Sequence, residues 1–358
     1  MRKSIVSLFV SLACCLGAVA QAGDVLVTAA KPDRLFFIDA ASRSIRAEHK
    51  VAGAEGQIFT TIVSPDERTV YMLVDRMERV VGVDVASGKE VFRADLSSPG
   101  EQVKCFFALA VTSDGKELIA YELPTRLLPS EYQVEEPRFV VFKTGAGLAA
   151  KPVRTFAAPR RVHMILTRPG AHSFYAVGFD LYEYDLASGK LLATRGIQKW
   201  EIPNHAQPDL LAFWPVTEPT GVFTTPVYTA VGSGDSAVPT TALMSLDLKS
   251  GALHYQDFEP MSALIFSTVL SPDKHHAYGV YTTLTSIDVD RHKLEKRVPL
   301  DHTFYDVNVS TDGREIYLGG TNCDVGFYDA ATLAKKLILK LPGCGDQTLS
   351  TLRVIHGK

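Results

Sequence analysis

One short motif recurs seven times along this chain. Each copy has alternating apolar residues, a turn residue that is usually Asp, a few small residues and then a basic residue that starts a second strand, as in Val83-Asp84-Val85-Ala86-Ser87-Gly88-Lys89. The turn residues of the copies are Asp39, Asp84, Lys143, Asp185, Asp247, Asp288 and Asp329. A repeat of about 40 residues made from short strands is typical of β-propeller blades. The sequence therefore predicts an all-β, seven-bladed β-propeller with four antiparallel strands in each blade.

The Asp residues of these copies have a local explanation. An Asp before Ala-Ser-Gly or Leu-Lys-Ser-Gly accepts backbone N–H bonds in a hairpin turn. Lys143 breaks the pattern, although Thr144-Gly145 still turns the chain there. We therefore interpret the Asp residues as turn formers and not as metal ligands.

The two chain ends are expected to meet in the first blade. The first copy of the motif has no preceding Ser-Pro-Asp unit of the kind seen at Ser64-Pro65-Asp66, whereas residues 348–356 leave one strand over at the other end. The simplest arrangement places this last strand beside residues 25–50. Such a closure leaves only short, protected sheet edges.

Three irregular segments are expected on one face of the propeller. Four of the six intervals between motif copies span 41–45 residues, but two span about 60. The extra residues lie at 121–137 and 226–240, between the second and third strands of blades three and five, and we expect long loops there. A third segment, 196–209, joins blades four and five. Because strands alternate in direction, these connections emerge on the same side, and long loops on a rigid scaffold are usually functional.

The first residues are expected to form a targeting segment. Arg2 and Lys3 precede the mostly apolar residues 5–16, which are too few to span a bilayer, and A-x-A cleavage patterns follow at residues 18–22. We therefore predict a signal peptide over 1–22, a single propeller domain over 23–358 and a periplasmic location. The net charge of −3 gives no reason to expect nucleic acid or a membrane surface as a partner.

Three cysteines remain after removal of this segment. Cys105 lies in an apolar run and is expected to be a buried, inert thiol. Cys323 and Cys344 fall in two connections that should share the face of the long loops. A disulfide between them is geometrically allowed in an oxidising compartment, and two free thiols remain the alternative.

The chain has none of the sequence patterns that hold a cofactor. A metal-binding spacing, a Gly-x-Ser-x-Gly elbow, a P-loop, a dinucleotide fingerprint and a Cys-x-x-Cys-His haem signal are all missing from the sequence. We therefore expect no cofactor-binding or metal-binding residue on this chain, and the lack of a catalytic residue is an implication of the family resemblance given below.

Both tryptophans lie in the segment 197–215, which the repeat does not explain. One interpretation is a hydrophobic plug across the seam of blades four and five, and another is an interface anchor, because buried Trp and Tyr dominate binding hot spots. The residues that we select as candidates for a partner surface or substrate cavity are Glu122, Arg126, Trp200, Gln207, Asp209, Trp214, Tyr228, Tyr305 and Asn308. Arg126 is expected to pair with Glu122 or to reach a partner.

Several of these segments resemble one known family over nearly the whole length of the mature chain. The matching stretches include Tyr121-Glu122 with Pro124 and Arg126-Leu127, Ile197-Gln198 with Trp200-Glu201, Ala206-Gln207-Pro208-Asp209, Tyr228-Thr229-Ala230, and Val307-Asn308-Val309-Ser310-Thr311-Asp312-Gly313. The chain is similar in them to the β subunit of bacterial quinohemoprotein amine dehydrogenase, a seven-bladed propeller of the YVTN-like repeat type. General propeller turns would not produce the segments at Trp200 and at residues 207–209.

The resemblance implies a periplasmic heterotrimer that oxidises primary amines to aldehydes and ammonia. In that family a small γ subunit carries cysteine tryptophylquinone and a dihaem cytochrome c α subunit carries the haems, whereas the propeller carries neither. It holds the small subunit and helps to wall the substrate cavity. A stand-alone lactonase-like propeller enzyme and a general protein-interaction propeller remain the alternatives.

Overall fold

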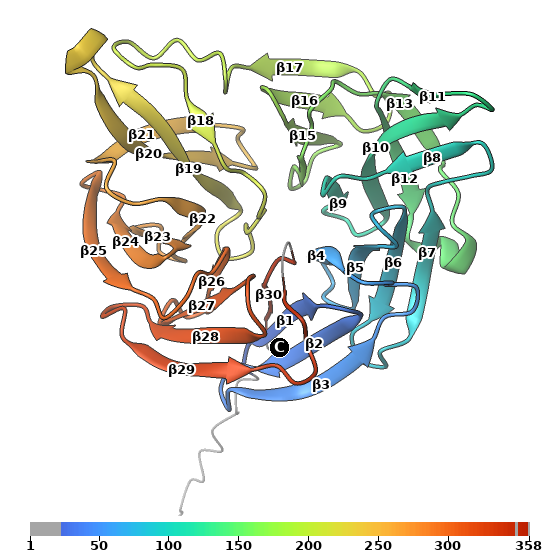
Figure 1. The fold of residues 1–358 in the computed structure, drawn as a ribbon, viewed down its shortest axis with the longest axis horizontal. Coiled ribbons are helices and arrows are strands. Elements are labelled where there is room, and N and C mark those ends of the chain that lie inside the picture. Colours follow the sequence, from blue (N-terminus) through green and yellow to red (C-terminus); the bar gives the residue numbers. More distant parts are fainter. Residues whose placement is uncertain (1–22, 348–349, 357–358) are drawn as a thin grey trace, which may run out of the picture.

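Seven β-sheets stand around a central axis in the computed structural model, which describes residues 23–347 and 350–356 (Figure 1). Blade 1 contains, from the axis outward, β30 (Arg353–Ile355), β1 (Val25–Ala30), β2 (Arg34–Asp39) and β3 (Ser44–Lys50). Blade 2 contains, in the same direction, β4 (Phe59–Val63), β5 (Thr69–Val74), β6 (Arg79–Asp84) and β7 (Glu90–Asp95). Blade 3 contains β9 (Leu109–Val111), β10 (Glu117–Leu127), β12 (Arg138–Lys143) and β13 (Arg154–Ala157), with β8 (Glu101–Lys104) and β11 (Tyr132–Val134) added to β10.

The remaining blades keep the same order of strands. Blades 4 and 5 contain β14 (Met164–Thr167), β15 (Ser173–Val177), β16 (Leu181–Asp185) and β17 (Leu191–Arg195), then β18 (Asp209–Leu210), β19 (Val222–Val231), β20 (Val238–Asp247) and β21 (Leu253–Pro260). Blades 6 and 7 contain β22 (Ile265–Leu270), β23 (His276–Tyr281), β24 (Thr283–Asp288) and β25 (Lys293–Pro299), then β26 (Asp306–Val309), β27 (Glu315–Gly319), β28 (Asp324–Asp329) and β29 (Lys335–Lys340). The prediction of seven antiparallel blades is confirmed.

The closure of the ring is also as predicted. β30 pairs antiparallel with β1 through Val25↔Ile355, Leu26↔Val354 and Val27↔Arg353. The last strand is therefore the innermost strand of blade 1. The signal-peptide prediction concerns residues 1–22, which lie outside the described residues.

The Asp turns form as expected from the sequence. The Oδ1 atom of Asp84 accepts the backbone N–H of Ser87 at 2.8 Å and its hydroxyl at 2.6 Å. Equivalent backbone bonds reach the carboxylates of Asp39, Asp185, Asp247, Asp288 and Asp329. At Lys143 a 3-10 helix, η1 (Thr144–Ala149), replaces the turn. These carboxylates therefore act as hydrogen-bond acceptors in local turns at the strand ends.

Apolar residues from neighbouring blades pack together between the sheets. Between blades 3 and 4, for example, the ring of Phe139 lies 5.1 Å from Phe174 and 5.2 Å from Tyr184, and Phe139 and Phe174 are completely buried. Burying one such side chain contributes about 2–3 kcal/mol. Every blade therefore depends on both of its neighbours, which makes the ring a rigid support.

Two segments that we expected to be long loops are extended hairpins. β10 continues to Leu127 and β19 continues to Val231, where the short 3-10 helix η2 (Gly234–Ser236) follows. The expectation of loops was wrong because Pro124 and Pro226 do not end these strands: Pro226 pairs with Leu243, and the pairs on both sides of it are kept. A proline removes one N–H from a ladder and leaves its neighbours free to pair.

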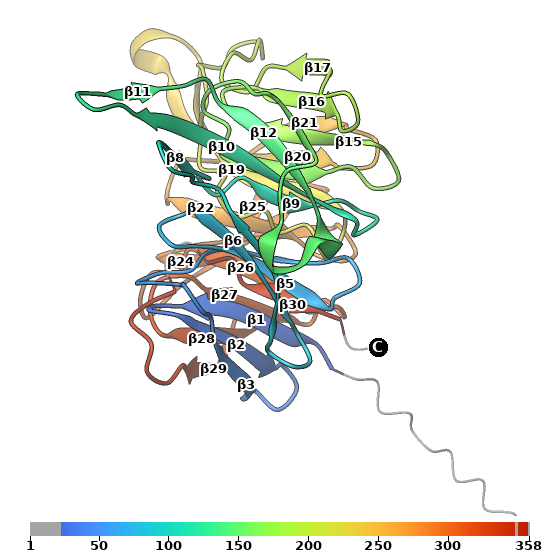
Figure 2. The same cartoon turned by 90° about the vertical axis from the view of Figure 1, so that its right-hand side faces the viewer.

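The extended hairpins leave the ring on one side (Figure 2). In that view β11 lies farthest from the side where β30 ends. No helix among the residues described here is long and apolar enough to cross a membrane.

Candidate functional site

We define the upper face as the side formed by the β5–β6, β10–β12, β19–β20 and β27–β28 connections, their equivalents in other blades, and the connections between blades. Cys323 follows β27 and Cys344 follows β29, and the two sulfur atoms form a disulfide with Cα atoms 5.6 Å apart. The disulfide, which the sequence left open, joins two upper-face connections. Cys105 is a free, buried thiol as expected.

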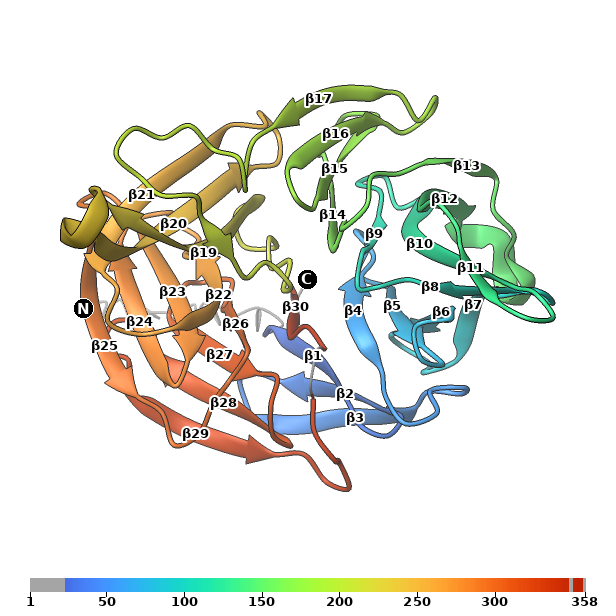
Figure 3. The same cartoon turned by 45° about the horizontal axis from the view of Figure 1, so that its top comes forward.

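The connection between β18 and β19, residues 211–221, folds into the centre of the ring (Figure 3). Phe213 lies 6.1 Å from the ring of Phe107 in blade 3 and 5.6 Å from His163 in blade 4. Trp214 lies 5.9 Å from Tyr305 in blade 7. One segment of blade 5 thus contacts three other blades. We call residues 213–218 the plug.

Arg353, in strand β30 of blade 1, holds the plug in place. Its Nη1 donates to the carbonyl of Pro215 at 2.6 Å and pairs with Glu218 at 2.7 Å, while Nε donates to the carbonyl of Thr61 at 2.8 Å. The Arg353 side chain is buried in β30. A buried guanidinium needs such partners, because an unpaired charge away from water costs several kcal/mol. The innermost strand of blade 1 therefore positions the plug.

Aromatic rings from six blades surround the axis at the upper end of the plug, and Phe213 and Trp214 of the plug are among them. We call this set the aromatic collar, and its members are Phe59, Phe106, Phe107, His163, Phe213, Trp214, Phe266, Tyr281 and Tyr305. Phe266 and Tyr281 stack with ring centroids 3.9 Å apart, and Tyr305 stacks on Phe266 at 5.0 Å.

The collar is only partly covered. Phe106 is 41% exposed, and Phe266, Tyr281 and Tyr305 are half-buried. Partly exposed aromatic side chains that gather on one face mark sites for ligands or other proteins. We therefore select the aromatic collar as the candidate binding surface of the upper face.

Below the plug, a cavity of about 380 Å³ opens near the turns of the opposite, lower face. Arg353 and Glu218 line it together with Glu67 and His356. The carboxylate of Glu67 accepts the backbone N–H of His356 at 3.0 Å and contacts its Nδ1 at 2.7 Å. Pro215, Thr217 and Glu218 of the plug also line this cavity, and most of its other lining side chains are apolar.

One carboxyl group in the channel wall is unusual. Asp306, at the start of β26, is fully buried and accepts the backbone N–H of Leu352. Burial raises the pKa of Asp306 to about 8, against the lowering influence of this N–H and of Arg353. The other oxygen, Oδ1, has no hydrogen-bond partner among the described residues. Burial therefore favours the neutral acid form of Asp306 over the carboxylate.

Trp200 fills the seam between blades 4 and 5. It belongs to a buried cluster that includes Tyr175 of blade 4 and Phe223 of blade 5, and its ring lies 4.9 Å from that of Tyr255. Its indole N–H donates to the carbonyl of Ala206 at 2.7 Å. The amide of Gln207 donates back to the carbonyl of Trp200 at 3.2 Å. The predicted packing across the seam of blades 4 and 5 is therefore found for Trp200 alone. Trp214 lies instead in the plug, residues 213–218, at the centre of the ring.

Tyr228 is also occupied by the fold. Its hydroxyl donates to the carbonyl of Ile265 and accepts the N–H of the same residue, both at 2.6 Å. Burial raises the pKa of Tyr228 to about 12. This hydroxyl connects blade 5 to the first strand of blade 6.

Blade 3 separates two candidates that we expected to pair. Glu122 is buried and bonds Arg138 at 2.6 Å, and Arg138 also holds Glu101 through two bonds. Burial raises the pKa of Glu122 in spite of Arg138. Arg126 instead pairs with Glu135 at 3.1 Å on the exposed hairpin. Of the two alternatives for Arg126, the pair with Glu122 was therefore wrong, and contact with a partner stays a prediction. The two side chains miss each other because of the strand register, which places Arg138 opposite Glu122.

The last two candidates, Asn308 and Asp209, form hydrogen bonds to the backbone of this chain. Asn308 is fully buried in β26, and its amide donates to the carbonyl of Leu352 at 3.0 Å. Asp209 is exposed in β18 and accepts the N–H of Leu210 at 2.8 Å. Of the nine candidates, the structure brings Trp214 and Tyr305 together in the collar, and Trp200 and Gln207 in the seam.

Sequence reasoning missed most of the collar and the ion pair of Arg353 and Glu218. A signal was present for some members: Phe59, Phe107 and Phe266 lie at or just before the start of innermost strands, which is where the channel opens. The position of Phe213 gave no such signal, because its contacts cross the axis.

The blade-three hairpin, residues 123–134, adds a second apolar surface to the upper face. Tyr132 is 78% exposed and Val134 is 68% exposed. Leu127 stands opposite Tyr132 in the ladder, so their side chains share one face of the hairpin. Arg126 and Glu135 form an ion pair in the same hairpin.

Comparisons with known proteins establish the fold. No family model matches the sequence, and no curated protein matches it. The solved structure of dihydro-heme d1 dehydrogenase NirN in complex with DHE is similar, with a TM-score of 0.57 and 17% identity over 92% of this chain and 74% of that chain. A functionally unknown protein from Desulfotomaculum acetoxidans has a TM-score of 0.61 and 11% identity over 94% and 100% of the two chains.

A third solved structure, hydrazine synthase of Kuenenia stuttgartiensis, has a TM-score of 0.51 and 15% identity over 87% of this chain and 90% of that chain.

Within residues 23–347 and 350–356, no three His, Cys, Asp or Glu side chains lie close enough to hold a metal ion.

Proposed function

We propose that this chain is the propeller subunit, without redox chemistry of its own, of a periplasmic quinohemoprotein amine dehydrogenase. Its upper face would hold the small quinone-bearing subunit and help to wall the cavity for a primary amine. The observation that carries the proposal is the aromatic collar, because it places partly exposed rings on the face where the specific segments of sequence resemblance also lie.

In this proposal the chemistry belongs to other chains. The cysteine tryptophylquinone would be carried by the small subunit and the haems by the dihaem cytochrome c subunit. The collar residues would exclude water and present apolar walls to the carbon chain of the amine. The plug would keep these walls rigid, since Arg353 and neighbouring blades hold it in place.

Purification of the complex tests the proposal. The mature chain is isolated from the periplasm with its partners, which are identified by mass spectrometry, and amine-dependent dye reduction is measured. A dihaem cytochrome and a small crosslinked quinone protein, together with amine activity, are the expected result. Recovery of the chain alone with lactone hydrolysis, or with other partners and no amine activity, would leave the two alternative functions.

Surface variants locate the partner. The exchange of Tyr132 and Val134 for Ser removes exposed apolar side chains from the blade-three hairpin and is expected to lower recovery of the small subunit about tenfold, because a few such side chains dominate most interfaces. Leu192→Ser is the matched control, since Leu192 is 51% exposed on the outer strand β17. Equal recovery for both variants would place the partner elsewhere.

A further inference from the structure

The seam where the chain closes, which is the contact of β30 with β1 inside blade 1, has a short ladder. β30 has three residues and pairs with β1 at three positions, whereas β1 pairs with β2 at six. A short strand contributes few backbone bonds, so the closing strand needs other contacts to stay in place.

These contacts come from the segment that leads into β30. We call residues 341–347 and 350–352 the strap. Its backbone pairs with the β1–β2 turn: Gly345 N–H donates to the carbonyl of Lys31 at 2.9 Å, and Lys31 N–H donates to the carbonyl of Asp346 at 2.7 Å. The hydroxyl of Ser350 accepts the N–H of Ala29 at 2.9 Å. The strap is therefore an additional contact layer for blade 1.

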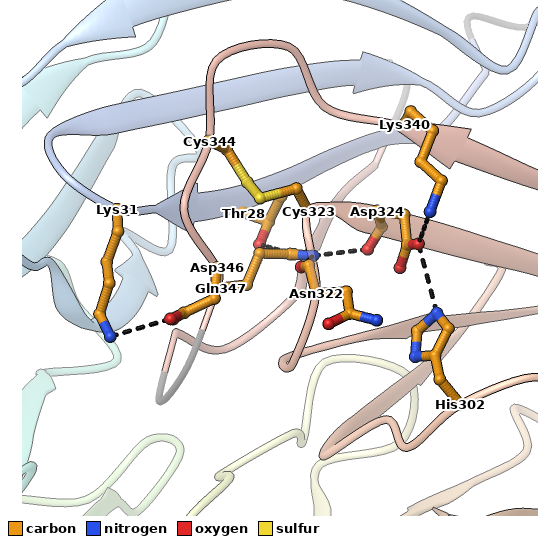
Figure 4. Close-up of a disulfide and its surroundings, with 10 residues drawn as sticks. All are labelled: Thr28, Lys31, His302, Asn322, Cys323, Asp324, Lys340, Cys344, Asp346 and Gln347. Atoms are coloured by element: carbon orange, nitrogen blue, oxygen red, sulfur yellow. Dashed lines mark hydrogen bonds and ion pairs between the residues drawn. A yellow bond between two sulfur atoms is a disulfide. The ribbon is translucent and has the colours of Figure 1, made fainter.

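One buried side chain of the strap bridges blades 1 and 7 (Figure 4). Gln347 accepts the hydroxyl of Thr28 from blade 1 at 2.7 Å. Its amide donates to the carbonyl of Asn322 at 2.7 Å and to that of Asp324, both from blade 7. A buried amide with these partners is costly to displace, because each group would lose a hydrogen bond away from water.

The disulfide is the covalent attachment of the strap. Cys344 lies three residues before Gln347, and its partner Cys323 lies between Asn322 and Asp324. Asp324 is fully buried and is held by Lys340 at 2.5 Å and by His302 at 3.2 Å. The bond thus fixes the strap to the anchored end of the β27–β28 connection. Both cysteines are half-buried, so a small thiol reagent can reach them.

We propose that the Cys323–Cys344 disulfide is an oxidative latch that completes the closure of the propeller. When the bond forms, the two thiols give up two protons and two electrons, and a disulfide-bonded oxidant takes up both by thiol–disulfide exchange and is released as a dithiol. In the dithiol form, Gln347 and Ser350 lose their covalent tether to blade 7, and β30 separates from β1 more often. Closure of this ring therefore depends on the redox state of the compartment.

Hydrogen–deuterium exchange of the mature chain tests the latch. The folded, oxidised protein is compared with the same protein after reduction by dithiothreitol, with the gain of two free thiols verified by mass. Amides of β1 and β30 are expected to exchange about tenfold faster after reduction, because opening at the seam costs less. Amides of β15, on the opposite side of the ring, are expected to keep their rate (Figure 1).

Two variants sharpen this test. Cys344→Ser should reproduce the effect of reduction, whereas Cys105→Ser should leave the exchange of the oxidised protein unchanged at the seam. Equal exchange of β1 and β30 in the oxidised and reduced proteins would overturn the latch. A uniform loss of protection in β1, β30 and β15 would also overturn it, since the disulfide would then support the whole fold and not the seam. None of these measurements involves amines or a partner, so the result is independent of the proposed function.

Discussion

Asp306 gives the sharpest test of the channel wall. Its carboxyl group is fully buried at the start of β26, and burial raises its pKa to about 8, whereas an unfolded chain has a pKa near 3.8. At pH values between these two pKa values, Asp306 keeps its proton in the folded protein and has released it in the unfolded chain. The free energy of unfolding therefore falls as the pH rises, and this loss is complete above the pKa of the folded state.

The size of the effect follows from the two pKa values. One pH unit corresponds to about 1.4 kcal/mol per proton, so Asp306 alone should lower the free energy of unfolding by about 3 kcal/mol between roughly pH 6 and pH 9. Asp306→Asn removes the ionisation and keeps an oxygen that can accept the Leu352 N–H. The charged groups that face this carboxyl group are Arg353 from β30 and Glu218 from the plug.

Urea unfolding of both proteins at several pH values measures the difference. The stability of Asp306→Asn is expected to exceed that of the natural protein increasingly as the pH rises, and the gap should stop growing above about pH 8. Asp301→Asn serves as the control, because Asp301 is an exposed carboxylate with a lowered pKa and does not titrate in this window. If the free energy of unfolding changed with pH in the same way for the natural protein and for Asp306→Asn, Asp306 would be ionised in the folded protein. Our account of the buried acid would then be refuted.

Three further predictions concern stability and are checked by urea unfolding. Trp200→Ala should cost about 3–5 kcal/mol, because it empties the seam of blades 4 and 5 and removes one of the two donors of the Ala206 carbonyl; a cost below about 1 kcal/mol would mean that the seam closes without the indole. Arg138→Met should cost about 3–5 kcal/mol by leaving Glu122 buried without its cation, and adding Glu122→Gln should recover part of this loss; no recovery would show that Glu101 and not Glu122 is the important partner. Asp185→Ala should lower the free energy of unfolding slightly through its lost turn bonds, and a neutral result would remove our reason for the repeated Asp.

The repeat made most of the fold predictable. The blade count, the closure by the last strand and the upper-face position of the disulfide all follow from one motif and from the alternation of strand direction. Such inferences succeed because a turn such as that of Asp84 is determined by residues close in sequence. The prediction failed where local signals were misleading, since Pro124 and Pro226 resemble strand ends but lie within β10 and β19.

The site was less predictable than the fold. Trp214 and Tyr305 were identified from the residue types, but the plug depends on contacts of Phe213 and Arg353 across the axis. These contacts join blades that are distant in sequence, so no spacing along the chain predicts them. The pairing of Glu122 with Arg138 likewise depends on the register of two strands, which the residue pattern did not determine.

The place where the chain begins and ends in the ring has a practical consequence. Val25 stands beside Ile355, and His356 borders the cavity of the lower face, so both ends of the described chain lie away from the aromatic collar (Figure 2). Attachment to a sensor chip or bead through either end would turn the collar and the blade-three hairpin toward the solution. A protein immobilised in this way would present one orientation, and weak binding to its upper face could be measured without obstruction by the linker.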